Sequence, residues 1–186
     1  MTTVSDLHIG GYHPASFIDY PGKVAAVVFF QGCNFHCPYC HNAQLIPRNR
    51  AGVYSPQEVL ARLRQRAGKL AGVVLSGGEP TLQRALPAFC SELKRLDYAV
   101  KLDTNGSNPD LLNVLLANKL VDYVAMDLKA PWKRYPDLAG TEIDSDALCR
   151  SLHLIGSSGI GHHFRTTFDR SRLSEDDLVL IRAVVP

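Results

Sequence analysis

Val24-Ala-Ala-Val-Val-Phe-Phe30 runs directly into Gln31-Gly-Cys-Asn-Phe-His-Cys-Pro-Tyr-Cys-His-Asn42. The apolar first half is typical of a strand that is buried on both faces of a sheet. The second half places Cys33, Cys37 and Cys40 close together on one short loop. A structural zinc site takes four protein ligands and an electron-transfer cluster takes four thiolates, so three thiolates favour a four-iron cluster with one open iron. An open iron can bind a substrate, which makes such a cluster a reagent.

Downstream of this junction, apolar runs alternate with helical patterns, beginning with a helix for which Ser55 is the N-cap and Pro56 the first residue. Pro87 should delay or kink the second helix. The expected strands are 24–30, 72–75, 98–102, Tyr123–Asp127 and 164–168. The expected helices are 55–66, 83–96, Pro109–Ala117, 145–155 and 174–184.

This order repeats a β-α unit about five times, which predicts an α/β fold with a parallel sheet and outer helices. A closed eight-stranded barrel needs about 250 residues, and this chain has 186. We therefore expect an open, partial β/α barrel that forms a single domain over residues 1–186. A final strand could be missing from it.

Polar residues cluster directly after four of the expected strands, at 31–42, 76–80, 103–106 and 127–129. The active sites of parallel α/β folds lie at the carboxyl ends of the strands. The sequence therefore predicts that four separate loops converge on one mouth.

The composition and net charge of the chain argue against several classes of function. A net charge of +2 argues against a nucleic-acid partner, and no apolar run reaches membrane-spanning length. The first residues lack the basic and apolar regions of a signal peptide. The five cysteines do not resemble a small secreted disulfide framework, which favours a reducing compartment. We expect a cytoplasmic protein with no membrane partner.

Other readings of the cysteines remain. Zinc could bind the three thiolates with His36 or His41 as the fourth ligand, although zinc modules usually bring two separated ligand pairs and no second pair follows here. A disulfide between two of the loop cysteines would leave the third unpaired. Cys90 and Cys149 lie in helical patterns, where we expect small buried apolar side chains.

The Cys-x3-Cys-x2-Cys spacing, with Tyr39 before the last cysteine, resembles the radical S-adenosylmethionine (SAM) enzymes over nearly the whole chain. The resemblance implies that Cys33, Cys37 and Cys40 hold three irons of a [4Fe-4S] cluster and that SAM chelates the fourth. An electron from the cluster would cleave SAM to methionine and a 5′-deoxyadenosyl radical. Tyr39 would pack near the adenine, and its alternative role is loop packing.

Ser76-Gly-Gly-Glu-Pro80 follows the strand at 72–75 and matches the Gly-Gly-Glu-Pro motif of this family. The match implies that Gly77, Gly78 and Glu79 grip the amino group of SAM, since carboxylates and carbonyls accept hydrogen bonds from an ammonium. A glycine pair is equally typical of a tight turn.

Asp103-Thr-Asn-Gly106 and Asp127-Leu-Lys129 end the next two strands and resemble the activases of glycyl-radical enzymes. The resemblance implies that Asp103, Thr104 and Asp127 hold a small monovalent cation beside SAM, a role that suits hard oxygen ligands. Lys129 would face the SAM carboxylate. From the residues alone, the first motif is also a plain turn and the second a surface ion pair.

Two further residues complete the expected SAM site. Asn105 would be a cofactor contact within the first of these motifs. Arg165 would lie near the SAM carboxylate or ribose, as a basic or polar residue does in relatives, or else it is an exposed strand arginine. No general base is expected, since the cluster and SAM would supply the chemistry.

Ser16-Phe-Ile-Asp-Tyr-Pro-Gly-Lys23, together with the cysteine loop, narrows the resemblance to anaerobic ribonucleoside-triphosphate reductase activating proteins. This implies an enzyme that makes a glycyl radical on anaerobic ribonucleotide reductase, with a flavodoxin or ferredoxin as electron donor. Trp132 and Tyr135 are expected beside the groove that receives the partner, or else in a hydrophobic lid that contacts no partner. One alternative is a radical SAM enzyme acting on a small molecule or modified base, such as a deazapurine synthase. The other is a non-catalytic metal-binding or electron-transfer module.

Overall fold

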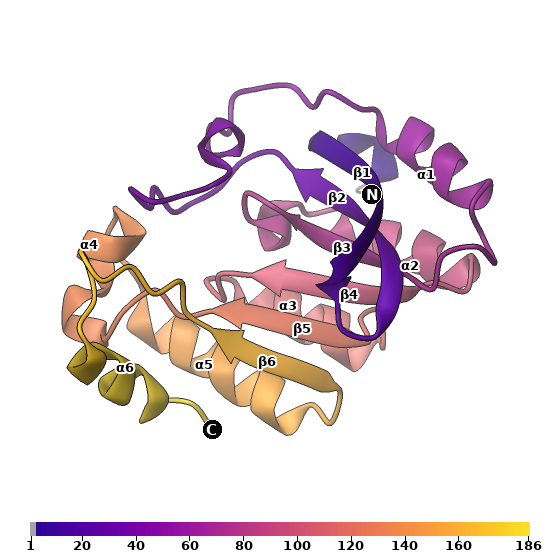
Figure 1. Ribbon diagram of the computed structural model, residues 1–186. Coiled ribbons are helices and arrows are strands. Elements are labelled where there is room, and N and C mark those ends of the chain that lie inside the picture. The colour runs from indigo at the N-terminus through magenta and orange to yellow at the C-terminus, as the bar shows by residue number, and fades with distance from the viewer. Residues whose placement is uncertain (1–2) are drawn as a thin grey trace.

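The computed structural model describes residues 3–186, and its centre is a six-stranded sheet in the order β1-β2-β3-β4-β5-β6 (Figure 1). The strands are β1 (Ile9–Tyr20), β2 (Lys23–Phe30), β3 (Gly72–Gly77), β4 (Ala99–Thr104), β5 (Tyr123–Asp127) and β6 (Gly161–Arg165). From β2 onward all neighbours are parallel, and the sheet stays open. The predicted α/β fold with an open, partial β/α barrel is confirmed.

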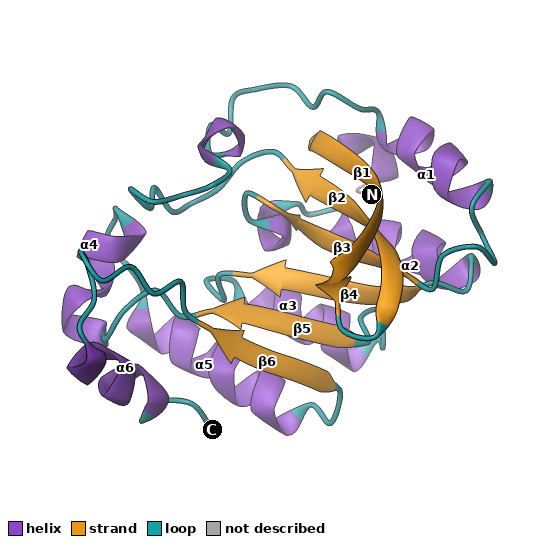
Figure 2. Ribbon diagram, viewed as in Figure 1, coloured by secondary structure: helices purple, strands orange, loops and turns teal. Residues whose placement is uncertain are grey.

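Helices follow the strands along the chain, and the longer ones cover one face of the sheet (Figure 2). They are α1 (Pro56–Arg64), α2 (Leu86–Arg95), α3 (Pro109–Ala117), α4 (Tyr135–Ala139), α5 (Ser145–Ser157) and α6 (Glu175–Arg182). The N-caps act as expected, because the Ser55 side chain accepts from Glu58 N and Ser174 forms a capping box with Asp177. Pro87 delays the start of α2 to Leu86.

Four short 3₁₀ helices complete the secondary structure of the described residues. They are η1 (Val4–Asp6), η2 (Ala43–Leu45), η3 (Pro80–Leu82) and η4 (Trp132–Arg134). Of these, η2 contacts the start of the cysteine loop, where Gly32 N donates to Leu45 O, and the short helix α4 contacts the same loop, where His36 N donates to Ala139 O. Neither the four 3₁₀ helices nor the short helix α4 was expected from sequence, because each is too short to show a helical period.

Strand β1 was not expected, and it pairs antiparallel with β2, so the sheet is mixed. Its sequence, Ile-Gly-Gly-Tyr-His-Pro-Ala-Ser-Phe-Ile-Asp-Tyr, contains glycines and a proline, which sheets tolerate at edges and bulges. The register shifts three times along the pair. β1 curves across the face of the sheet that the helices leave open (Figure 1), and the Tyr20 ring comes 5.9 Å from the Tyr123 ring on β5.

The last strand also differs from expectation, because β6 is Gly161–Arg165 and not 164–168. Its burial is only partial along its length, which weakened the apolar signal. The earlier position matters for the site, since it makes Arg165 the final residue of β6, paired in register with Asp127 at the end of β5.

Candidate active site

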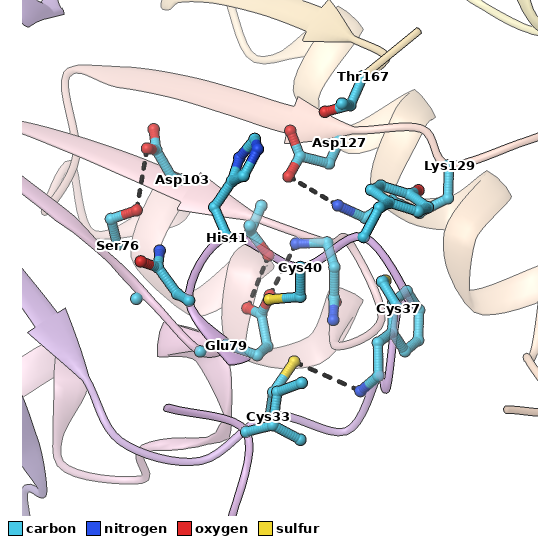
Figure 3. Close-up of a pocket in the computed structure, with 18 of the residues that line it drawn as sticks. Cys33, Cys37, Cys40, His41, Ser76, Glu79, Asp103, Asp127, Lys129 and Thr167 are labelled. Carbon is cyan, nitrogen blue, oxygen red and sulfur yellow. Dashed lines mark hydrogen bonds and ion pairs between the residues drawn. The ribbon is translucent and has the colours of Figure 1, made fainter. Parts of the chain in front are cut away.

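A cavity of about 300 Å³ lies at the carboxyl ends of the parallel strands (Figure 3). Its lining includes every residue that the sequence singled out for cluster, SAM or cation binding: Cys33, Cys37, Tyr39, Cys40, Gly77, Gly78, Glu79, Asp103, Thr104, Asn105, Asp127, Lys129 and Arg165. The four predicted loops therefore do meet at one mouth. His41, which the sequence analysis considered as a zinc ligand, also lines it. The other lining residues were not predicted as site residues, and they are Phe35, Asn42, Ile46, Ser76 and Thr167.

The loop that carries the three thiols is fixed by backbone hydrogen bonds at several points. Cys33 N donates to Ile46 O at 3.0 Å, which folds the loop back on itself. His36 N donates to Ala139 O at 2.7 Å, which ties the loop to the end of α4. Arg48 Nε donates to Cys33 O at 3.2 Å. These bonds hold the thiols against the ends of the strands.

The thiols themselves are partly buried and chemically suited to a metal. Burial raises the pKa of the Cys33 thiol to about 12 and also raises that of Cys37. Both thiols are therefore neutral at pH 7 unless the positive charge of a metal stabilises the thiolate. Phe35 N donates to Cys33 Sγ at 3.3 Å, the kind of contact that supports a charged sulfur.

No fourth cysteine joins this set in the described chain, because Cys90 is buried in α2 and Cys149 is exposed on α5. The expectation for Cys90 is confirmed, and that for Cys149 was wrong because its helix turns that position toward solvent. His41 lines the cavity and His36 is not among its lining residues. Within residues 3–186, no three His, Cys, Asp or Glu side chains converge closely enough to hold one metal ion.

Glu79 is the most buried acid of the site, at 1% exposure. Its Oε1 accepts from Thr81 N at 3.0 Å, Thr81 Oγ1 at 2.6 Å and Thr104 Oγ1 at 2.8 Å. Its Oε2 accepts from Asn105 N at 2.7 Å. Burial raises the pKa of the Glu79 carboxyl, and these four hydrogen bonds oppose that rise. The carboxylate clamps the end of β3 to the end of β4.

The glycine pair before Glu79 serves this same junction. Gly77 has φ +113°, and a Cβ on Gly78 would come within 2.2 Å of Gly32 O. Any side chain at Gly78 would push the cysteine loop away from β3. The two glycines, which the sequence predicts to contact SAM, therefore also allow two segments of this chain to approach each other closely.

Acidic and basic side chains form a network on the opposite side of the cavity (Figure 3). Asp103 Oδ2 accepts from Ser76 Oγ at 3.1 Å and lies 3.5 Å from the Arg165 guanidinium. Asp127 Oδ1 accepts from Arg165 Nε at 2.5 Å, and Asp127 Oδ2 accepts from Lys129 Nζ at 3.0 Å. Arg165 thus bridges the two acids, so the exposed strand arginine of the alternative reading has a defined place in the site.

The charges of this network are stable at neutral pH. Burial raises the pKa of Asp127, but Lys129 and Arg165 lower it more, so the net shift is downward. Burial lowers the pKa of Lys129, and Asp127 more than offsets this, so the net shift is upward. The bases consequently stay protonated and Asp127 stays ionised. The ammonium of Lys129 and the guanidinium of Arg165 suit an anionic ligand group such as a carboxylate.

Tyr39 lines the same cavity as the thiols and this network. The Arg172 guanidinium lies 5.9 Å from the centre of its ring, and its hydroxyl is buried without a hydrogen-bond partner in the described residues. Burial raises the pKa of Tyr39 to about 12, so the hydroxyl remains a donor. Both the packing role and a ligand role fit this position.

The expectation for Tyr135 was wrong. Its side chain is fully buried, it meets the Phe35 ring edge-on at 6.3 Å, and it stacks on Trp132 at 5.6 Å. Neither Tyr135 nor Trp132 lines the cavity. Through Phe35, this pair of aromatic rings packs against the cysteine loop.

Sequence reasoning also missed Lys101, which is 2% exposed and pairs with Asp103. The available signal was a lysine in the middle of the otherwise apolar strand Tyr-Ala-Val-Lys-Leu at 98–102. A buried lysine almost always has a partner of opposite charge.

We expect the Asp127→Asn variant to bind SAM about tenfold or more weakly while its iron content stays normal, because Lys129 and Arg165 lose the acid that orients them. Isothermal titration of SAM into the anaerobic protein measures this. Asp110→Asn is the matched control, since Asp110 pairs with Arg150 on the exposed surface. Equal SAM affinity in Asp127→Asn and the parent would mean that the network is only structural.

No helix in the described residues is both long and apolar enough to cross a membrane.

Comparisons with known proteins agree with this geometry. A family model described as the radical SAM superfamily matches residues 27–171. A protein of Methanocaldococcus jannaschii, provisionally named a glycyl-radical enzyme activating enzyme, is 35% identical over 176 residues, covering 91% of this chain and 72% of the relative. The 7-carboxy-7-deazaguanine synthase of Thermococcus kodakarensis is 30% identical over 58% of this chain and 50% of its own length. The chain thus spans about half to three quarters of these relatives.

The fold has counterparts among solved structures. Streptococcus suis SuiB bound to S-adenosylmethionine superposes with a TM-score of 0.65 at 16% identity, over 85% of this chain and 38% of SuiB. At this identity the likeness concerns the fold alone.

Proposed function

Because the chain belongs to the radical SAM superfamily, we propose that it is an activase that uses a [4Fe-4S] cluster and SAM to make a glycyl radical on anaerobic ribonucleoside-triphosphate reductase. The observation that carries the proposal is the single cavity that joins three thiols on one loop to the polar ends of β3, β4, β5 and β6. An iron-sulfur or flavin protein would supply the electron.

The residues of the cavity fit the two groups. The thiols of Cys33, Cys37 and Cys40 would hold three irons, and the rim of Lys129 and Arg165 would receive the SAM carboxylate. When bound, the cluster and SAM supply reductive cleavage of SAM to methionine and a 5′-deoxyadenosyl radical, which removes the α-hydrogen of a glycine. The Gly77 and Gly78 backbone beside the thiols would accept from the SAM ammonium, since both oxygens of Glu79 already accept hydrogen bonds.

The size of the cavity supports a protein substrate. Ligand sites usually span roughly 300–1,000 Å³, and this cavity, at about 300 Å³, lies at the lower limit. A four-iron cluster and one SAM molecule would together fill it, so the substrate would approach from outside, as a glycine on an extended loop can.

A second candidate is a radical SAM enzyme acting on a modified base, favoured by the likeness to 7-carboxy-7-deazaguanine synthase. Both candidates need the same cluster and the same SAM contacts. They differ in whether SAM cleavage is stimulated by a protein or by a deazapurine precursor.

The test combines the reduced, iron-loaded protein with SAM and an anaerobic ribonucleotide reductase, followed by electron paramagnetic resonance. We expect a carbon-centred signal on the reductase whose splitting changes when its glycine is deuterated, and no signal with the Cys40→Ala variant. SAM cleavage without any radical on the reductase would overturn the activase proposal, and stimulation by a deazapurine precursor would favour the second candidate.

A further inference from the structure

Lys101 is a buried charge on the inner face of β4, two residues before Asp103. Within residues 3–186, its ammonium has one hydrogen-bond partner, Asp103 Oδ1. Taking an ammonium out of water is costly unless an anion compensates it, so burial of this lysine at 2% exposure ties it to Asp103.

The oxygens that a small cation would need at this place are committed elsewhere. Asp103 Oδ1 faces Lys101, while Asp103 Oδ2 faces Ser76 and Arg165. Both oxygens of Asp127 face bases, Lys129 and Arg165.

Thr104, the third expected ligand, is not available either. Successive side chains of a strand point to opposite faces, so Thr104 points away from Asp103. Its Oγ1 donates to Glu79 Oε1 at 2.8 Å and accepts from Gly106 N at 3.1 Å. A hard cation needs several oxygens that converge on one point, and these oxygens do not.

The balance of charges also argues against a bound metal cation at this place. Lys101, Lys129 and Arg165 bring three positive charges to the two carboxylates of Asp103 and Asp127. A bound metal cation would add a fourth positive charge within a few ångströms of the other three, which Coulomb repulsion in a buried site opposes.

We infer that the ammonium of Lys101 takes the place of a bound monovalent cation at Asp103, so that this chain orders the acidic side of its SAM site with its own side chains alone. Lys101 is a positioning residue, since it does not line the cavity and acts through Asp103. The inference rests on the proposed SAM site, but its thermal readout below does not need SAM.

The first measurement uses the iron-loaded wild-type protein. SAM affinity is determined by isothermal titration in sodium, potassium and tetramethylammonium chloride at equal ionic strength. We expect the three dissociation constants to agree within about twofold, because no cation enters the site. SAM binding that requires sodium or potassium overturns the inference, whereas a protein that binds no SAM in any salt refutes the proposed function instead.

The second measurement uses Lys101→Met, which keeps an unbranched side chain one atom shorter and removes its charge. Asp103 is then left with a vacant, buried oxygen that a small cation can reach from the cavity. We expect sodium or potassium to raise the thermal midpoint of this variant and to restore a SAM affinity that falls about tenfold or more in tetramethylammonium.

Two control variants test whether the cation response depends on the pair of Lys101 and Asp103. Lys94→Met removes the ammonium from a more exposed ion pair with Asp122 outside the cavity and should show no cation response. The double variant Lys101→Met, Asp103→Asn lacks the vacant carboxylate and should lose the response that the single variant gains. If Lys101→Met folds but is indifferent to sodium and potassium, Lys101 does not replace a cation. If it does not fold, the wild-type salt comparison decides.

Discussion

Replacing Cys33, Cys37 or Cys40 with alanine should abolish both four-iron binding and SAM cleavage. The three thiols lie on one loop at the cavity, and the described chain brings no other cysteine to it that could substitute. A four-iron cluster held by two thiolates has two unprotected irons and would be lost during purification. Iron and sulfide analysis, with quantification of 5′-deoxyadenosine, measures the loss.

Cys149→Ala is the control for these variants, because Cys149 is exposed on α5 and should leave iron content and SAM cleavage unchanged. A triple alanine variant of the loop cysteines that still bound four irons would refute the cluster assignment.

Glu79→Ala should destabilise the protein by about 3–5 kcal/mol and abolish measurable SAM binding. The change leaves four buried donors without their acceptor, and they come from Thr81, Thr104 and Asn105. It also releases the end of β3 from the end of β4, where the cavity is built. Denaturant unfolding of the iron-loaded protein under anaerobic conditions measures the free energy of unfolding.

Glu58→Ala is the matched control, since Glu58 forms an exposed pair with Arg62 on α1. Exposed helical pairs of this kind contribute about 0.3–0.5 kcal/mol. A loss below about 1 kcal/mol for Glu79→Ala would show that the four hydrogen bonds do not stabilise the folded state as described.

The sequence alone predicted the features that depend on a few neighbouring residues. These features are the run of apolar residues before Cys33, the proline and serine signals at helix starts, and the glycines at the end of β3. Each of them is found in the structure near its expected place. The parallel order of β2 to β6 follows from the same local signals, because helical crossovers impose it.

Features that depend on contacts between distant parts of the chain could not be predicted from the sequence. Strand β1 has weak intrinsic strand character and exists because β2 supplies an edge to pair with. The burial of Lys101 depends on its neighbours in register, Val74 on β3 and Tyr123 on β5. The burial of Glu79 depends in part on donors from Thr104 and Asn105 at the end of β4. Tyr135 seemed suited to a surface groove, yet it is buried by packing against Trp132 and against Phe35, which lies far earlier in the chain.

The proposed function depends on three thiols that leave one iron of the cluster open for SAM at this cavity. Pulsed electron-nuclear double resonance of the reduced protein, with SAM labelled by ¹⁵N in its amino group and ¹⁷O in its carboxylate, tests it most directly. We predict hyperfine couplings from both labels to the cluster in the parent protein and in Cys149→Ala. A four-iron cluster that forms normally and shows neither coupling at saturating SAM would contradict the account.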